Sequence, residues 1–197
     1  MVIDFSIESI YSVSKAHIRG RNKILAKRII CLPWRDFGQP SIDARWMKKD
    51  GLNHYGYKNH IDVDVKHKLI RSYEVTPASV HDSEVFEDLL DEDNSSRDVW
   101  ADSAYRSGEK LRELKERNYR EHLQRKGCKH KKLTDREVQD NRTRSRIRSR
   151  VEYVFGVQAK WAGKLIVRTI GLVRVKAKVG LRNFAYNLDR YRVLARA

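Results

Sequence analysis

Two aspartates of this sequence lie in or beside predicted strands, at positions where a carboxylate can take part in chemistry. Asp102 directly follows the apolar run "VWA", and the crevice beyond strand ends is where α/β proteins place their sites. Asp4 lies within "VIDFSIE", which alternates apolar and polar residues with the period of a strand. If the two strands are neighbours, the two carboxylates converge. The alternatives are a turn-capping role for Asp102 and an exposed strand position for Asp4.

Glu152 stands just after the most basic stretch of the chain, "NRTRSRIRSR". An ion pair with Arg148, one helical turn earlier, is one interpretation, and such a pair is worth about a few tenths of a kcal/mol. A metal ligand is the other, because Mg²⁺ prefers carboxylate oxygens and would screen the repulsion among three acids. Two such ions can activate a water or a 3′-hydroxyl against a phosphodiester. Five arginines would then hold the phosphate backbone: Arg142, Arg144, Arg146, Arg148 and Arg150.

The composition supports a nucleic-acid partner. The 197 residues carry 42 Lys and Arg against 26 Asp and Glu, and this net charge of +16 indicates a polyanion such as DNA. No apolar run approaches the roughly 20 residues of a membrane span, and no signal peptide is visible. Two separated cysteines argue against a disulfide framework and against a zinc site. We therefore expect a single cytoplasmic domain over residues 1–197, with no membrane partner.

The predicted elements follow one another in the order of an α/β protein with a mixed sheet. A strand over residues 2–10 is followed by an irregular stretch, within residues 10–40, that shows no clean period. Two β-rich runs, "YKNHIDVDV" and "LIRSYEVT", predict a hairpin. The rest of the chain predicts, in turn, a helix over 79–93, a strand over 97–105, a helix over 107–118, a strand over 119–126, and helices over 134–161 and 173–197.

All four of these predicted helices carry recognisable signals. The spacing of Leu111 and Leu114 predicts an inward face for the helix over 107–118. Thr134 and Glu137 have the spacing of a capping box at the start of the long helix. Two apolar stripes are expected to face the core: Val85, Phe86, Leu89 and Leu90 in the helix over 79–93, and Leu181, Phe184, Ala185 and Leu188 in the last helix.

Two further groups of polar residues could hold a ligand. His60, Asp62 and Asp64 alternate along one strand and therefore share one face. A metal cluster is conceivable there, but a solvated polar face of the hairpin is the expectation. His81 and Asp82 lie where a helix begins, and a helix cap with a surface histidine is favoured over a place beside the site.

Aromatic and basic side chains are interleaved in a second candidate DNA surface: Trp46, Lys48, Lys49, Tyr55, Tyr57 and Lys58. Such a mixture is typical of surfaces that stack on bases and hold a phosphate backbone. Core packing of the aromatic rings, with a basic rim around them, explains the same residues nearly as well.

Four segments, taken in order, resemble the DDE transposases of bacterial insertion sequences, specifically the insertion-sequence-five family. They are "DARWMKKDGLNHYGYKNHIDVDVKHKLI", "VTPASVHDSEVFEDLL", "VWADSAYRS" and "NRTRSRIRSRVEYVFG", and the resemblance covers about residues 41–195. It implies a ribonuclease H-like mixed sheet flanked by helices. It also implies an Asp-Asp-Glu triad that uses Mg²⁺, with Mn²⁺ as a substitute. The implied reaction is cut-and-paste strand transfer at the terminal inverted repeats, on double-stranded DNA.

By this resemblance the second aspartate of the triad is Asp102, in "WADSAYRS", and the glutamate is Glu152, in "RVEYVFG". The first aspartate is Asp4, because "VIDFSIE" is similar to the family's first strand. All three would then be catalytic residues and metal ligands.

The family's "Y-x2-R-x3-E-x6-K" signature is kept in part. Arg148 matches its arginine, whereas Ser145 stands at the tyrosine position and Ala159 at the lysine position. Lys160 follows one residue late and is included among the expected DNA contacts. Residues 10–40 do not resemble the family's loop after the first strand.

The resemblance further implies an amino-terminal DNA-binding region, which we expect this chain to lack, and a homodimer in the synaptic complex. Hence the alternative to an active transposase is a catalytically inactive fragment that only binds DNA. A nuclease of the same core that cuts without joining, and a basic RNA-binding protein, are the remaining hypotheses.

Overall fold

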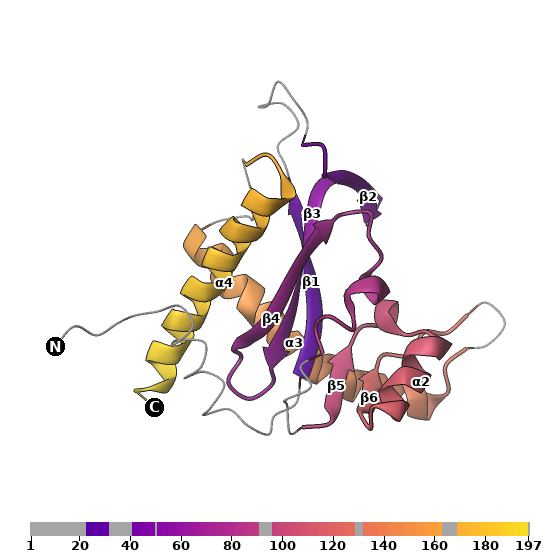
Figure 1. The fold of residues 1–197 in the computed structure, drawn as a ribbon. Helices are drawn as coiled ribbons and strands as arrows, with labels where there is room; N and C mark the ends of the chain where they lie inside the picture. Colours follow the sequence, from indigo (N-terminus) through magenta and orange to yellow (C-terminus); the bar gives the residue numbers. More distant parts are fainter. Residues whose placement is uncertain are drawn as a thin grey trace.

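The computed structural model describes residues 23–31, 41–49, 51–90, 96–128, 132–162 and 169–196, and gives only the backbone of residues 23–29, 31 and 162. These residues form a mixed α/β fold, as the sequence predicts (Figure 1). With η denoting a 3₁₀ helix, the elements are β1 (Lys23–Cys31), β2 (Arg45–Lys49), β3 (Leu52–Asp64), β4 (Ile70–Pro77), η1 (Asp82–Val85), β5 (Asp98–Ala101), η2 (Ser103–Tyr105), α2 (Gly108–Glu116), β6 (Arg120–Leu123), α3 (Asp135–Ala162) and α4 (Leu172–Leu194).

The strands form a 6-stranded sheet in which β1 is central. On one side β1 pairs with β3 in antiparallel orientation, and on the other it pairs with β5 in parallel orientation. β6 extends the sheet parallel to β5, whereas β2 and β4 pair one after the other along the far edge of β3. The sheet is therefore antiparallel on one side of β1 and parallel on the other.

The central position of β1 contradicts the expectation that residues 10–40 are irregular. Its sequence, "KILAKRIIC", has apolar residues in short runs rather than in strict alternation. A strand in the interior of a sheet need not alternate, so a search for a period of two residues misses it. The predicted strand over residues 2–10 lies outside the described residues.

Most of the other predicted elements are confirmed. β3 and β4 form the predicted hairpin, and β5, α2, β6 and α3 begin and end within a few residues of their predicted bounds. The capping box of α3 is present, because Thr134 Oγ1 accepts a hydrogen bond from the Glu137 N–H while Glu137 Oε2 accepts one from the Thr134 N–H. The predicted helix over 79–93 is wrong in type, because the described part of that range, residues 79–90, contains the short 3₁₀ helix η1 followed by turns up to Leu89, and no α-helix.

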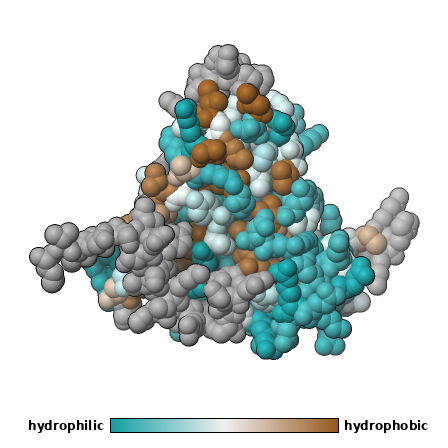
Figure 2. Space-filling model, viewed as in Figure 1, coloured by the Kyte–Doolittle hydropathy of each residue, from teal (hydrophilic) through white to brown (hydrophobic). Residues whose placement is uncertain are grey.

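The helices cover both faces of the sheet. On one face, Ile61 of β3 and Trp100 of β5 share a buried cluster with Val154 of α3 and Tyr186 of α4. On the other face, apolar side chains of the segment after β4, of η2 and of α2 pack against β5 and β6. That second cluster contains the predicted inward residues Phe86, Leu89, Leu90 and Leu114. Figure 2 shows hydrophilic side chains gathered over the α2 end of the molecule.

The inward face of α4 differs from the predicted one. Its buried residues are Val175, Val179, Asn183 and Tyr186. Leu181 and Leu188 of the predicted stripe are 69% and 47% exposed. The prediction failed because α4 carries apolar residues on two sides, and periodicity alone does not decide which side meets the sheet. The polar side chain of Asn183 has a partner in this buried position: its Oδ1 accepts a hydrogen bond from Gln158 Nε2 of α3 at 3.0 Å.

Candidate functional site

Asp102 lies directly after β5, as predicted, and caps η2. Its backbone is extended, and its Oδ1 accepts a hydrogen bond from the backbone N–H of Ser103 at 2.6 Å. The side chain remains 41% exposed, and its second oxygen, Oδ2, is turned toward α3. The capping role weighed from the sequence is therefore real, and it leaves one carboxylate oxygen available for another partner.

α3 brings its arginine-rich stretch to the end of β5. Arg148 Nη1 lies 3.6 Å from Asp102 Oδ2. Val151, Val154 and Phe155 are buried and fix the rotation of the helix over the sheet. Glu152 lies one turn beyond Arg148 and is exposed. Asp102 therefore contacts the turn of α3 that precedes Glu152. A common site for the two acids stays a prediction.

Two of the arginines expected to hold DNA also tie α3 to the rest of the protein. Arg144 Nη1 donates to the Leu123 carbonyl at 3.1 Å, and Arg150 Nη1 donates to the Val65 carbonyl at 3.2 Å. Arg142 and Arg146 are exposed, as is Lys160 at the end of the helix. DNA contact by these residues stays a prediction.

Lys58 does not belong to a DNA surface, contrary to expectation. Its side chain is buried, and Nζ donates to the Val80 carbonyl at 2.6 Å and lies 3.2 Å from Asp82 Oδ1. Burial lowers the pKa of the Lys58 ammonium, although the nearby Glu84 carboxylate opposes this shift. Asp82 is thus a buried partner of Lys58 and not a helix cap. His81 is exposed, as expected, and its own side chain caps η1.

The polar row on β3 is buried rather than solvated, so that expectation was wrong. His60, Asp62 and Asp64 are 0%, 0% and 3% exposed. The segment after β4 covers this face, because Ser72, which pairs with Asp62, donates from Oγ to the Leu89 carbonyl. Among the described residues, no group of three His, Cys, Asp or Glu side chains is arranged to hold a metal ion.

The residues of the second candidate DNA surface lie partly in the core and partly on the exterior of the protein. Tyr57 is buried, whereas Trp46 is 52% exposed and packs on Tyr55 with ring centroids 5.1 Å apart. Lys48 and Lys49 are exposed on β2. Core packing therefore accounts for Tyr57, and the exposed part of the surface is smaller than the sequence suggests.

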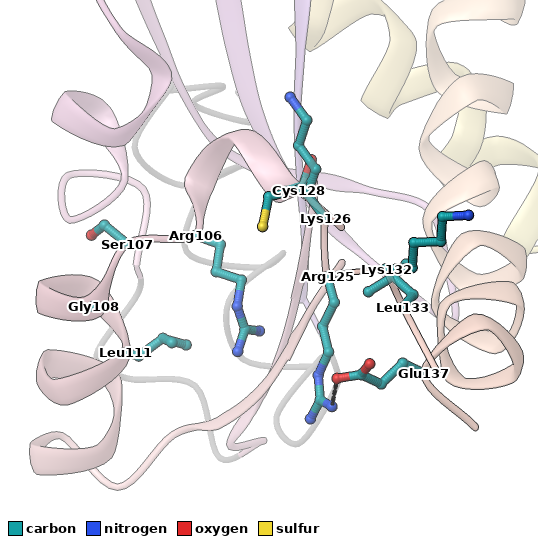
Figure 3. Close-up of a pocket in the computed structure, with 11 residues that line it drawn as sticks. Arg106, Ser107, Gly108, Leu111, Arg125, Lys126, Cys128, Lys132, Leu133 and Glu137 are labelled. Carbon is teal, nitrogen blue, oxygen red and sulfur yellow. Dashed lines mark hydrogen bonds and ion pairs between the residues drawn. The ribbon is translucent and has the colours of Figure 1, made fainter. Parts of the chain in front are cut away.

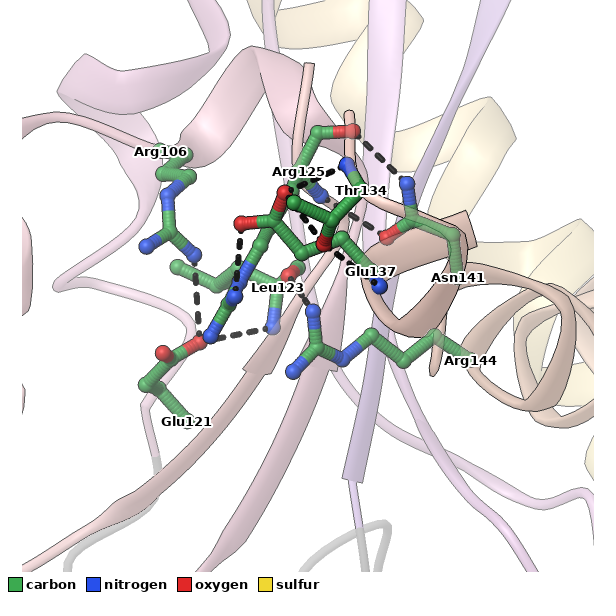
Figure 4. A network of polar contacts seen from close by, with 8 residues as sticks. All are labelled: Arg106, Glu121, Leu123, Arg125, Thr134, Glu137, Asn141 and Arg144. Atoms are coloured by element: carbon green, nitrogen blue, oxygen red, sulfur yellow. Dashed lines mark hydrogen bonds and ion pairs between the residues drawn. The ribbon is translucent and has the colours of Figure 1, made fainter. Parts of the chain in front are cut away.

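A network at the start of α3 was missed by the sequence analysis (Figure 4). Glu137 Oε1 accepts from Arg125 Nη1 at 2.9 Å, and Asn141 bonds to both the N–H and the carbonyl of Arg125. The hydrogen bonds from the Thr134 backbone and from the Arg125 side chain hold the pKa of the Glu137 carboxyl below its usual value. Only the capping box was visible in the sequence, because the contacts with Arg125 join distant parts of the chain.

Asp4 lies outside the described residues, so its place relative to Asp102 stays a prediction. Among the described residues, β5 lies between β6 and β1, and it pairs with β1 through Lys23 opposite Val99 and Ile24 opposite Trp100. β1 is the neighbour that precedes β5 in the chain. Its sequence, "KILAKRIIC", contains neither Asp nor Glu.

The family described as transposase DDE domain matches residues 15–188, which includes Asp102, Glu152 and most of the irregular stretch but not Asp4. This chain belongs to that family.

A transposase for insertion sequence element IS1106 from Neisseria meningitidis serogroup B is 33% identical over 146 residues. These residues make up 74% of this chain and 50% of that protein, so the chain spans about half the length of this curated relative. No solved structure matches the chain. No helix among the described residues is long and apolar enough to cross a membrane.

Proposed function

We propose that this chain is the catalytic part of a transposase that breaks and rejoins DNA phosphodiester bonds at the terminal inverted repeats of an insertion sequence. The observation that carries the proposal is the contact between Arg148 and Asp102. It joins the end of β5 to the basic face of α3, one turn before Glu152. Membership of the transposase family supports the same conclusion.

Asp102 and Glu152 are the proposed metal ligands within the described residues. Both are carboxylates that solvent reaches, and hard oxygen donors of this kind are those that Mg²⁺ and Mn²⁺ prefer. Asp4 is the proposed third ligand, on the family resemblance alone. When bound, such an ion supplies Lewis-acid polarisation of the phosphate and an activated nucleophile.

The chain's own groups prepare this site before any ion binds. The Ser103 N–H fixes one oxygen of Asp102, and the Arg148 guanidinium offsets the negative charge of the other. Arg148 is also the group best placed to exchange its partner, because a phosphate presents oxygens of the same charge as Asp102. We infer that Arg148 moves from the carboxylate to the DNA when an ion occupies the acids.

The strand order supports a ribonuclease H-like core, the finer fold that the resemblance implies. β4, β3 and β1 form an antiparallel series, and β5 and β6 continue it in parallel orientation. Helices lie on both faces, and Asp102 follows the first of the two parallel strands after β1. We propose that β2 is an addition at the far edge of this core.

The proposed DNA surface runs along the exposed side of α3 and over β2. It contains the charged residues that are both predicted and exposed or partly exposed: Arg142, Arg144, Arg146, Arg148, Arg150, Lys160, Lys48 and Lys49. Double-stranded DNA, both the element's ends and the target, is the proposed partner, which places the protein in the cytoplasm. A second copy of the chain in the synaptic complex is proposed on the resemblance alone.

A second candidate is a protein that binds DNA without cutting it. β1, one of the two strands that pair with β5, has no acid in its sequence, and this favours the second candidate. The position of Asp4 outside the matched residues 15–188 favours it as well. Such a protein would bind DNA through the same basic surface but would not cleave it.

Nicking of a supercoiled plasmid that carries the gene and its flanking DNA distinguishes the two. With Mn²⁺, the wild-type chain is expected to nick the plasmid, whereas D4N, D102N and E152Q are expected to nick it at least 100-fold more slowly while binding it normally. Binding without nicking by the wild type would establish the second candidate. Nicking by D4N at the wild-type rate would remove Asp4 from the site.

A further inference from the structure

A pocket of about 550 Å³ opens beside Asp102 (Figure 3). It lies between the start of α2 and the connection from β6 to α3, and Ser103, the neighbour of Asp102, forms part of its wall. Leu111 and Leu133 supply apolar lining. The pocket therefore adjoins the candidate site without containing either acid.

The lining is strongly basic. Arg106, Arg125, Lys126 and Lys132 contribute four cations against the single carboxylate of Glu137. Lys126 and Lys132 are exposed at the edge, and neither forms an ion pair with another described residue. Excess positive charge in a concave site attracts and concentrates anions.

The two arginines are held in place by partners on the body of the protein. Arg125 Nη1 lies 2.9 Å from Glu137 Oε1, and Arg106 Nη1 lies 3.5 Å from Glu121 Oε2 (Figure 4). Asn141 fixes the backbone of Arg125 through hydrogen bonds of 3.0 and 2.8 Å. Each arginine keeps further N–H groups for another acceptor, since a guanidinium has five donors.

We propose that this pocket binds one unpaired nucleotide of the DNA strand that passes Asp102, with its phosphate on the four cations and its base or sugar against the leucines. The size supports a nucleotide, because pockets of this volume hold small ligands whereas a duplex is too wide to enter. Enzymes that carry out chemistry on a base hold an extruded nucleotide in a pocket, which shows that a single nucleotide can be bound in this way. The inference rests on the proposed function, and it adds a site that positions the strand.

Gly108 offers a way to close the pocket without changing its charge. It lines the pocket, and a Cβ added there would meet no atom within 4 Å. G108F should therefore fold, and its ring adds bulk at the wall of the pocket. A177F, which adds the same ring on an exposed position of α4, is the matched control. K126Q/K132Q removes the two exposed cations, and R174Q/K178Q removes two exposed cations from α4.

Fluorescence anisotropy would measure binding of each variant to a blunt duplex and to the same duplex with a short single-stranded extension. We expect the wild type and both controls to bind the extended duplex more tightly than the blunt one, by about tenfold. G108F and K126Q/K132Q should lose this preference, and G108F should bind the blunt duplex normally. An undiminished preference in G108F and K126Q/K132Q would overturn the pocket proposal alone. Absence of any DNA binding by the wild type would overturn the proposed function as well.

Discussion

Arg148 Nη1, on α3, lies 3.6 Å from Asp102 Oδ2, at the end of β5. The two side chains are 30% and 41% exposed, and an ion pair in such surroundings contributes at most about 1 kcal/mol to stability. The contact nevertheless links the strand that carries one candidate acid to the helix that carries the other. Its main effect is therefore on position rather than on stability.

Replacing Arg148 should separate these two effects. We expect R148A to lower plasmid nicking by at least tenfold, because the guanidinium both orients Asp102 and receives the phosphate. The free energy of unfolding should change by less than about 1 kcal/mol. R148K, which keeps the charge but not the planar donors, should retain part of the activity. Arg192, which forms an exposed ion pair with Asp189, gives the control R192A, and equal nicking by R148A and R192A would contradict the expectation.

The buried pair of Lys58 and Asp82 makes a prediction about stability alone. D82A should lower the free energy of unfolding by about 3 to 5 kcal/mol, because it leaves the Lys58 ammonium buried without its partner. The double variant K58M/D82L should recover most of this loss, since it removes both charges. Urea denaturation of the single and double variants measures the difference. A D82A variant as stable as the wild type would show that the ammonium reaches water.

Gly180 of α4 makes a prediction about packing. A Cβ at this position would overlap the Tyr73 hydroxyl of β4, so G180A should destabilise the protein by about 1 to 2 kcal/mol despite the better helix propensity of Ala. Adding Y73F should restore part of the loss. G156A on α3, where a Cβ meets no atom within 4 Å, should stabilise by about 0.5 to 1 kcal/mol. Thermal unfolding of the two glycine variants should therefore move the midpoint in opposite directions.

The lowered pKa of Glu137 leads to a prediction about how stability depends on pH. Its pKa in the folded protein is held below the unfolded value of about 4.3, chiefly by the Thr134 backbone N–H and then by Arg125. A depressed carboxyl pKa contributes stability above the unfolded pKa, and this contribution is lost as the pH falls through the folded pKa. E137Q should therefore lose less stability than the wild type between neutral pH and pH about 3. An E116Q control, from the exposed end of α2, should follow the wild type in urea midpoints across this range.

The elements with strong local signals were predicted from the sequence alone. The Thr134 and Glu137 capping box located the start of α3, and the two alternating runs located the hairpin of β3 and β4. Asp102 was correctly placed at the end of a buried strand, because an apolar run followed by polar residues marks such an end.

The predictions that were wrong concern features that depend on contacts between residues far apart in the sequence. β1 lacks alternation because it is an interior strand, and α4 has apolar residues on two sides, so only the sheet decides which side is buried. Lys58 and Asp62 were taken for surface residues because a charged side chain in a strand is usually exposed. The segment after β4 buries both side chains, and the sequence near Lys58 and Asp62 contains no signal of this burial. Arg125 was missed for the same reason.

Calorimetric titration with Mn²⁺ tests the central claim, that Asp102 and Glu152 serve one ion, most directly. The wild-type chain should bind Mn²⁺, and D102N and E152Q should each lose that binding while keeping the wild-type unfolding midpoint. D98N, which changes an aspartate at the other end of β5 that lies 2.9 Å from His122, should bind as the wild type does. Undiminished Mn²⁺ binding by D102N and E152Q, or loss of binding in D98N alone, would contradict the claim.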